Sequence, residues 1–178
     1  MPETQWLQRS SPAFRLMIAT SWLAPDSWKQ NQEEAIREAI AAAPDWTEYL
    51  RLVDRHRTPA LSWAALRRVP GIAIPEPAAQ ELQKRGDACR KQAIKHCLLL
   101  AQLLKALNGA GIPAMSLKGP ILSHELYGDV GLRQSKDIDL AVTPGDLGRA
   151  SLPRHARLAS GFHLVSLDSP PMGKLPAP

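Results

Sequence analysis

Residues 117–142 read LKGPILSHELYGDVGLRQSKDIDLAV, and this stretch decides the fold of the chain. It ends in an apolar run, 138–142, whose alternate residues share one face of an expected strand. Asp137 and Asp139 then share the other face, with their Cα atoms about 6–7 Å apart. Two such carboxylates repel each other unless something positive lies between them. Mg²⁺ is the natural candidate because it is a hard cation that takes oxygen ligands. The alternative for an isolated pair is a strand whose Asp face meets water.

Lys118 and Gly119 form the second part of the pattern. Residues 112–117 suit a short buried strand, and Pro120 suits the first position of a helix, where its missing N–H costs nothing. Gly128 then suits the left-handed position at the end of that helix. A glycine turn between a strand and a helix N-terminus is an anion site, because unpaired N–H groups and the helix dipole point to one place. Together with the carboxylate pair, this phosphate-type site indicates nucleoside triphosphate chemistry.

The stretch resembles a bacterial nucleotidyltransferase family within the DNA polymerase β-like nucleotidyltransferase superfamily, in which a lysine-glycine pair replaces the usual glycine-serine turn. The resemblance rests on Lys118, Gly119, Leu122, Tyr127, Arg133, Asp137, Ile138, Asp139, Leu140 and Val142. It implies an α+β fold: an all-helical N-terminal region followed by a partial polymerase β-like core, a short mixed sheet with flanking helices. It also implies transfer of a nucleotidyl group from a nucleoside triphosphate, with release of pyrophosphate.

The expected site residues divide into two groups. Asp137 and Asp139 are the catalytic and metal-binding pair, and they are expected to hold two Mg²⁺ ions, or Mn²⁺ in their place, roughly 3.5–4 Å apart as in other two-metal sites. Gly119 and the helix start are expected to hold the β- and γ-phosphates. Lys118 either neutralises these phosphates or pairs with one of the Asp residues. Arg133 is a second phosphate clamp, because its planar fork of donors matches phosphate oxygens.

One departure from the superfamily pattern leaves other functions open. Members carry a third carboxylate on a later strand, and here Asp168 is the only late acid near a candidate strand, 161–167. We therefore expect a chain that is C-terminally truncated. An inactive remnant acting as a helical interaction module is one alternative. A nucleotide-sugar glycosyltransferase is another, because it also uses a DxD at a strand end, but it leaves Lys118 and Arg133 unexplained.

Bulk properties limit the partners. The 178 residues are 44% hydrophobic, enough for one domain with a core. The net charge of +5 is either ordinary solubility charge or an attraction for phosphates, and it forms no run of Lys and Arg interleaved with aromatics. We expect no membrane partner, no strong nucleic-acid binding and a cytoplasmic location, since the start has no signal-peptide pattern.

Cys89 and Cys97 lie too far apart on one helix for a disulfide and are expected to be free. The acceptor of the nucleotidyl group (a protein hydroxyl, a sugar, RNA or a small molecule) and the base preference stay open.

The remaining sequence divides into four expected regions: a disordered N-terminus over 1–13, a helical region over 14–108, the partial nucleotidyltransferase core over 109–168 and a disordered Pro-rich tail over 169–178. Periodicity and turn residues predict helices over 14–23, 27–43, 46–57, 60–68, 78–108 and from 144 to about 152. The longest of them is expected to break near Gly86 and to turn inward a stripe made of Ile94, Cys97, Leu98, Ala101, Leu104 and Leu107.

Overall fold

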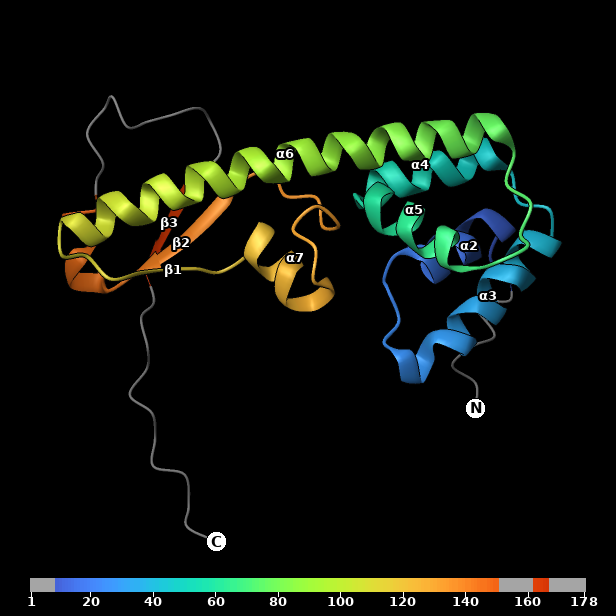
Figure 1. The fold of residues 1–178 in the computed structure, drawn as a ribbon, viewed down its shortest axis with the longest axis horizontal. Coiled ribbons are helices and arrows are strands. Elements are labelled where there is room, and N and C mark those ends of the chain that lie inside the picture. The colour runs from blue at the N-terminus through green and yellow to red at the C-terminus, as the bar shows by residue number, and fades with distance from the viewer. Residues whose placement is uncertain (1–8, 151–161, 167–178) are drawn as a thin grey trace, which may run out of the picture.

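The computed structural model describes residues 9–150 and 162–166. Helices occupy the first part of the chain, and a three-stranded sheet follows with one short helix between its first two strands. This is the α+β fold that the sequence predicts. A single long helix, α6 (Glu76–Gly109), runs through both parts. The N-terminal helices lie along its first half and the sheet along its second half (Figure 1).

Four helices and one short 3₁₀ turn form the N-terminal bundle: α2 (Pro12–Thr20), η2 (Asp26–Trp28), α3 (Lys29–Ala41), α4 (Trp46–His56) and α5 (Pro59–Arg68). Helix α4 begins with a side-chain cap, since Asp45 accepts hydrogen bonds from the N–H groups of Thr47 and Glu48. Helix α2 includes the last two residues of the stretch expected to be disordered, because Ser11 caps it and accepts from the N–H of Phe14. Residues 1–8 lie outside the described part of the chain.

The long helix does not break at Gly86, so that expectation is wrong. Gly86 lies against α5, and a Cβ added there would be 3.7 Å from the Cα of Ala60 and 3.7 Å from Cδ1 of Trp63. A small residue at this position lets two helices approach closely, which offsets the helix propensity that glycine loses.

The inward stripe of α6 also differs from the expected one. Ile94 and Leu98 are 50% and 63% exposed, and the buried residues of this half are Ala93, His96, Leu100, Leu103 and Leu107. Apolar residues surround the helix between Leu98 and Leu104, so the periodicity does not single out one face. The sheet selects the face, because Leu100, Leu103 and Leu107 form one hydrophobic cluster with Ile138, Leu140 and Val142.

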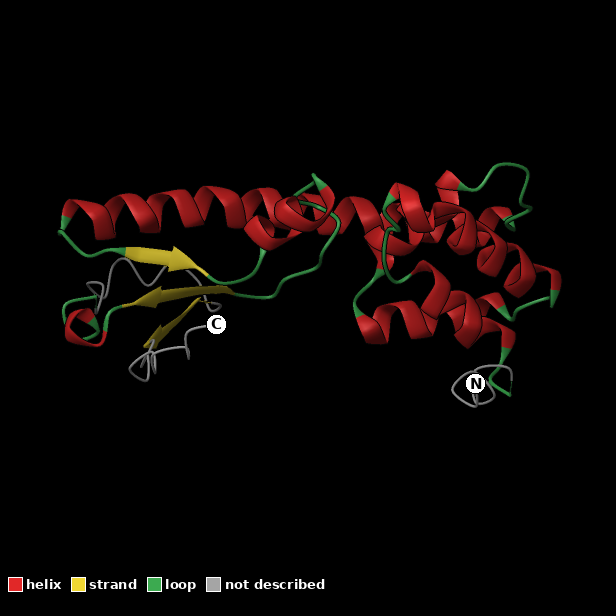
Figure 2. Cartoon of the chain, turned by 90° about the horizontal axis from the view of Figure 1, so that it is seen from below, coloured by secondary structure: helices red, strands yellow, loops and turns green. Residues whose placement is uncertain are grey.

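The sheet is mixed, as the resemblance implies. Strand β1 (Ala114–Ser116) pairs antiparallel with β2 (Ile138–Val142), and β2 pairs parallel with β3 (Phe162–Ser166). Figure 2 shows this sheet on one side of α6. The expected strand over 161–167 is therefore present, and its backbone places His163 beside Asp139 in the register. Helix α6 contributes Leu82 to the hydrophobic cluster of the bundle and Leu100, Leu103 and Leu107 to the cluster of the sheet.

After β2 the chain forms a 3₁₀ turn, η3 (Pro144–Asp146), in place of the longer helix expected there. The Thr143 hydroxyl donates to Asp146 at 2.8 Å, and the buried Ala150 joins the cluster under the sheet. Residues 151–161, Asp168 and the Pro-rich tail lie outside the described residues.

Two further observations bear on the class of protein. Cys89 and Cys97 are free thiols, as expected, and burial raises the pKa of Cys89, which disfavours the nucleophilic thiolate. Within residues 9–150 and 162–166, no helix combines the length and apolar character needed to cross a bilayer.

Candidate functional site

An ion pair joins the two parts of the sequence pattern. The Nζ atom of Lys118 lies 3.1 Å from Oδ2 of Asp139. Asp139 is only 8% exposed, and it lies on β2 between residues that pack against α6. Lys118 reaches it from the end of β1, where the N–H of Leu117 donates to the Asp139 carbonyl at 3.0 Å. The antiparallel pairing of the two strands therefore brings the lysine to the carboxylate.

Gly119 links β1 to helix α7 (Pro120–Tyr127) in a conformation that favours glycine. Its backbone has φ of 75° and ψ of −143°, a region that residues with a side chain rarely occupy. Pro120 begins the helix without an N–H, as the sequence predicts, and Gly128 ends it with φ of 71°. The mouth of α7 lies beside the start of β2, because a Cβ at Gly119 would be 3.9 Å from the carbonyl oxygen of Asp137 and 3.7 Å from the Ser135 hydroxyl.

Asp137 precedes β2 and is half-buried. The Ser135 hydroxyl donates to its carbonyl at 2.7 Å, which fixes the backbone just before the strand. Burial lowers the pKa of His96 on α6, and the negative charge of Asp137 opposes this shift in part. Asp137 therefore lies near both the Gly119 turn and the middle of the long helix.

A buried hydroxyl organises the loop that carries Arg133. Ser123 on α7 is fully buried, donates to the Asp129 carbonyl at 2.7 Å and accepts from the N–H of Arg133 at 3.0 Å. The Arg133 side chain is half-buried, and within the described residues its guanidinium makes no hydrogen bond or ion pair. The structure thus fixes the backbone of Arg133 without bringing its guanidinium into contact with Lys118 or the two carboxylates.

The same loop is held against α6 by a second contact. Arg90 on α6 pairs with Asp129 at 2.6 Å, and Asp129 also accepts from the N–H of Gly131 at 2.8 Å. Gly131 packs directly on the helix, since a Cβ there would lie 3.1–3.2 Å from Arg90 atoms. The long helix therefore serves as the support against which the loop before β2 is positioned.

The donor set fits a hard divalent cation. The ion pair with Lys118 shows that a positive charge can lie beside the Asp139 carboxylate. Asp137 and Asp139 both offer carboxylate oxygens, which are the ligands that such a cation prefers. The described residues contain no group of three or more His, Cys, Asp or Glu side chains close enough to hold a metal ion. Asp137 and Asp139 stay the metal ligands that the sequence predicts, and Asp168, the third candidate from the sequence, lies outside the described part.

Sequence reasoning missed Ser123, Ser135, Gly131 and His96. A serine within a short helix was the available signal for Ser123, because a buried hydroxyl needs partners. Ser135 acts on the backbone two residues later, whereas the roles of Gly131 and His96 depend on contacts between segments far apart in the sequence.

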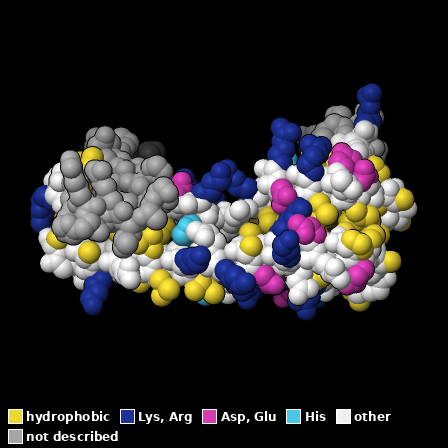
Figure 3. All heavy atoms as spheres, turned by 90° about the horizontal axis from the view of Figure 1, so that it is seen from above, with side chains coloured by type: hydrophobic (Ala, Val, Ile, Leu, Met, Phe, Trp, Pro, Cys, Tyr) yellow, Lys and Arg dark blue, Asp and Glu magenta, His cyan; other side chains and the backbone are white. Residues whose placement is uncertain are grey.

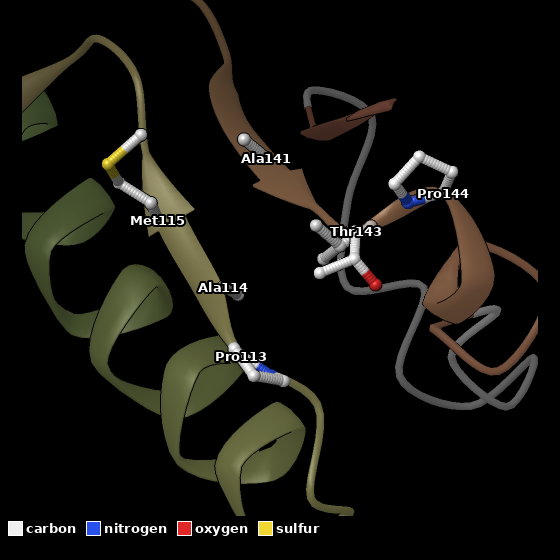
Figure 4. Close-up of a pocket in the computed structure, with 7 residues that line it drawn as sticks. Pro113, Ala114, Met115, Ala141, Thr143 and Pro144 are labelled. Carbon is white, nitrogen blue, oxygen red and sulfur yellow. The ribbon is translucent and has the colours of Figure 1, made fainter. Parts of the chain in front are cut away.

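A hollow of about 540 Å³ lies farther along the sheet, lined by Pro113, Ala114, Met115, Ala141, Val142, Thr143 and Pro144 (Figure 4). Among these described residues no side chain is ionisable, and Thr143 supplies the polar side-chain atom. On the face seen in Figure 3, Lys and Arg side chains are spread over the length of the molecule, with Asp and Glu among them on the N-terminal bundle.

The mixed sheet backed by helices, with a lysine-glycine turn beside an acidic strand, agrees with the nucleotidyltransferase class that the sequence predicts. Comparison with family models agrees, since residues 42–154 match a family described as uncharacterised nucleotidyltransferase. The match covers more than half of the chain, and the protein belongs to this family. Neither a curated protein nor a solved structure matches the chain.

The Gly119 turn gives a direct test of the site. Gly119→Ala should destabilise the fold by about 1–3 kcal/mol, because alanine rarely adopts this backbone conformation, and should weaken nucleoside triphosphate binding. Urea unfolding and isothermal titration measure the two effects. Gly109→Ala is the matched control: a Cβ there meets nothing within 4 Å at the end of α6, so stability should stay level or rise. Equal nucleotide affinity in both variants would contradict a role for the turn.

Proposed function

We propose that the protein is a Mg²⁺-dependent nucleotidyltransferase that moves a nucleoside monophosphate from a nucleoside triphosphate to a hydroxyl acceptor. The acceptor oxygen bonds to the α-phosphorus, the bond from this phosphorus to the pyrophosphate oxygen breaks, and the hydroxyl proton passes to solvent. The observation that carries the proposal is the ion pair between Lys118 and Asp139 beside the glycine turn. It combines carboxylate, cation and anion-binding backbone within one small region.

The turn at Gly119 and the residues around it bind the triphosphate. Gly119 and the start of α7 supply N–H groups and the positive end of a helix dipole for the β- and γ-phosphates. Lys118, 60% exposed, can turn from Asp139 to the phosphates without leaving a packed position. The unpaired guanidinium of Arg133 suits a phosphate clamp, because its loop is fixed by Ser123 while its fork of donors is unused.

Asp137 and Asp139 would hold the metal ions, Mg²⁺ or Mn²⁺. When bound, the metal supplies charge neutralisation at the phosphates and a more acidic acceptor hydroxyl. The work of the protein residues is to hold these two carboxylates in place, which β2 and Ser135 support. The acceptor is one of the four classes that the sequence leaves open: a protein hydroxyl, a sugar, RNA or a small molecule.

The test is pyrophosphate release. The purified chain is incubated with each of the four ribonucleoside triphosphates, α-³²P-labelled, with MgCl₂ or MnCl₂ and with candidate acceptors. Release with at least one triphosphate, absent in an Asp137→Asn/Asp139→Asn variant, supports the proposal. Failure with every triphosphate contradicts it and favours an interaction module. Release of a nucleoside diphosphate from a sugar nucleotide instead would indicate a glycosyltransferase.

A further inference from the structure

His96 is the buried polar side chain of α6 that the proposed mechanism does not use. It is 7% exposed, and its Nε2 atom lies 2.8 Å from the amide nitrogen of Gln92, one turn earlier on the helix. An amide nitrogen can only donate, so Nε2 accepts and the ring proton is on Nδ1. That Nδ1 atom is buried and has no hydrogen-bond partner within the described residues.

The fold brings the His96 turn of α6 and the start of β2 to the same end of the sheet. His96 precedes Leu100 by one helical turn, about 5.4 Å along the axis, and Leu100 packs in the same cluster as Ile138, the first residue of β2. The end of the strand where Asp137 lies therefore faces the His96 turn of α6. The effect of the Asp137 charge on the imidazole agrees with this placement.

A buried donor without a partner costs about 1–3 kcal/mol. Native structures keep such a group where its partner arrives with a ligand, or where it performs a function. An N–H donor beside a metal-binding carboxylate restrains the orientation of that carboxylate. Removing a hydrogen-bond partner of a metal ligand lowers metal affinity by about 10–100-fold.

We infer that His96 is a positioning residue for Asp137: its Nδ1–H donates to the Asp137 carboxylate when the site holds metal and nucleotide, and Gln92 fixes the ring so that this proton is available. The inference rests on the proposed function, since it assigns Asp137 a metal. His96 acts through Asp137 and touches neither phosphate nor acceptor.

The two ring nitrogens can be separated by substitution. The amide nitrogen of Asn matches the position of Nδ1, whereas that of Gln matches Nε2. The experiment measures Mn²⁺ binding to the full chain by the electron paramagnetic resonance signal of free MnCl₂, without nucleotide and with a nonhydrolysable triphosphate. Variants are His96→Asn, His96→Gln and His96→Leu, with His124→Leu, an exposed histidine on α7, as the control.

His96→Leu and His96→Gln should weaken Mn²⁺ binding about 10–100-fold, with the larger loss in the presence of triphosphate, while His96→Asn stays within about threefold of the wild type. Wild-type Mn²⁺ affinity in all three variants overturns the inference. Wild-type affinity in His96→Gln together with reduced affinity in His96→Asn also overturns it. The Asn and Gln variants can be compared even if the Leu variant unfolds.

The same titration separates the two proposals. Unchanged binding in His96→Leu, with binding lost in Asp137→Asn, contradicts only the positioning role. A wild-type chain that binds no Mn²⁺ contradicts the proposed function and the role of His96 together.

Discussion

Asp139→Asn should reduce the rate of pyrophosphate release by about 10²–10³-fold or more while leaving the fold intact. A bound metal contributes several kcal/mol of charge stabilisation to phosphoryl chemistry, and each 1.36 kcal/mol corresponds to a factor of ten in rate. Asn keeps the size of the side chain but loses the negative charge. The effect on stability should be small, because the partner, Lys118, is 60% exposed and such pairs contribute roughly 0–1 kcal/mol.

Two measurements check this prediction. Isothermal titration should show that Mg²⁺-dependent binding of nucleoside triphosphate is lost in Asp139→Asn, and in Asp137→Asn as well. Asp87→Asn, an exposed acid on α6, is the control with the same change in charge. Nucleotide binding in the double variant equal to that of the wild type would show that the carboxylate pair does not hold metal.

Leu140→Ala, one residue along the same strand, should lower stability strongly and should not act on the chemistry directly. Leu140 is fully buried between Leu100, Leu103 and Leu107 of α6 and its neighbours in the sheet. Removing such a side chain leaves a cavity and costs about 2–5 kcal/mol. Any loss of activity in this variant should follow the fraction of folded protein, because Leu140 lies on the face of β2 that packs on α6.

Urea unfolding followed by far-UV circular dichroism measures the change. Leu98→Ala on the exposed side of α6 is the control, and it should shift stability by about 0.5 kcal/mol or less. A cost below about 1 kcal/mol for Leu140→Ala would mean that the sheet does not pack on α6 as described.

Separate local patterns in the sequence mark the lysine-glycine turn and the acidic strand. Lys118 and Gly119 lie in one turn between a strand and a helix, and Asp139 lies 21 positions later on a short apolar strand. The sequence left two roles open for Lys118, neutralising phosphates or pairing with an Asp. The structure shows the pair with Asp139, which depends on the strand register that brings the end of β1 to this residue.

The supporting residues could not be read in this way. Ser123, Arg90 and Gly131 act through contacts across 6 to 41 positions of sequence, and each is an ordinary residue in its own segment. His96 carries no such signal in the sequence, because a single histidine on a helix is usually structural. Its relation to Asp137 exists only once α6 covers β2.

The sequence by itself determined the order of helices and strands, the glycine turn and the acidic strand, since each depends on backbone preferences and side-chain alternation over a few residues. The tertiary structure decided which face of α6 is buried and that Gly86 joins two helices instead of breaking one. The physical reason is that apolar residues surround α6 in its second half, so only the sheet that packs against it selects a face.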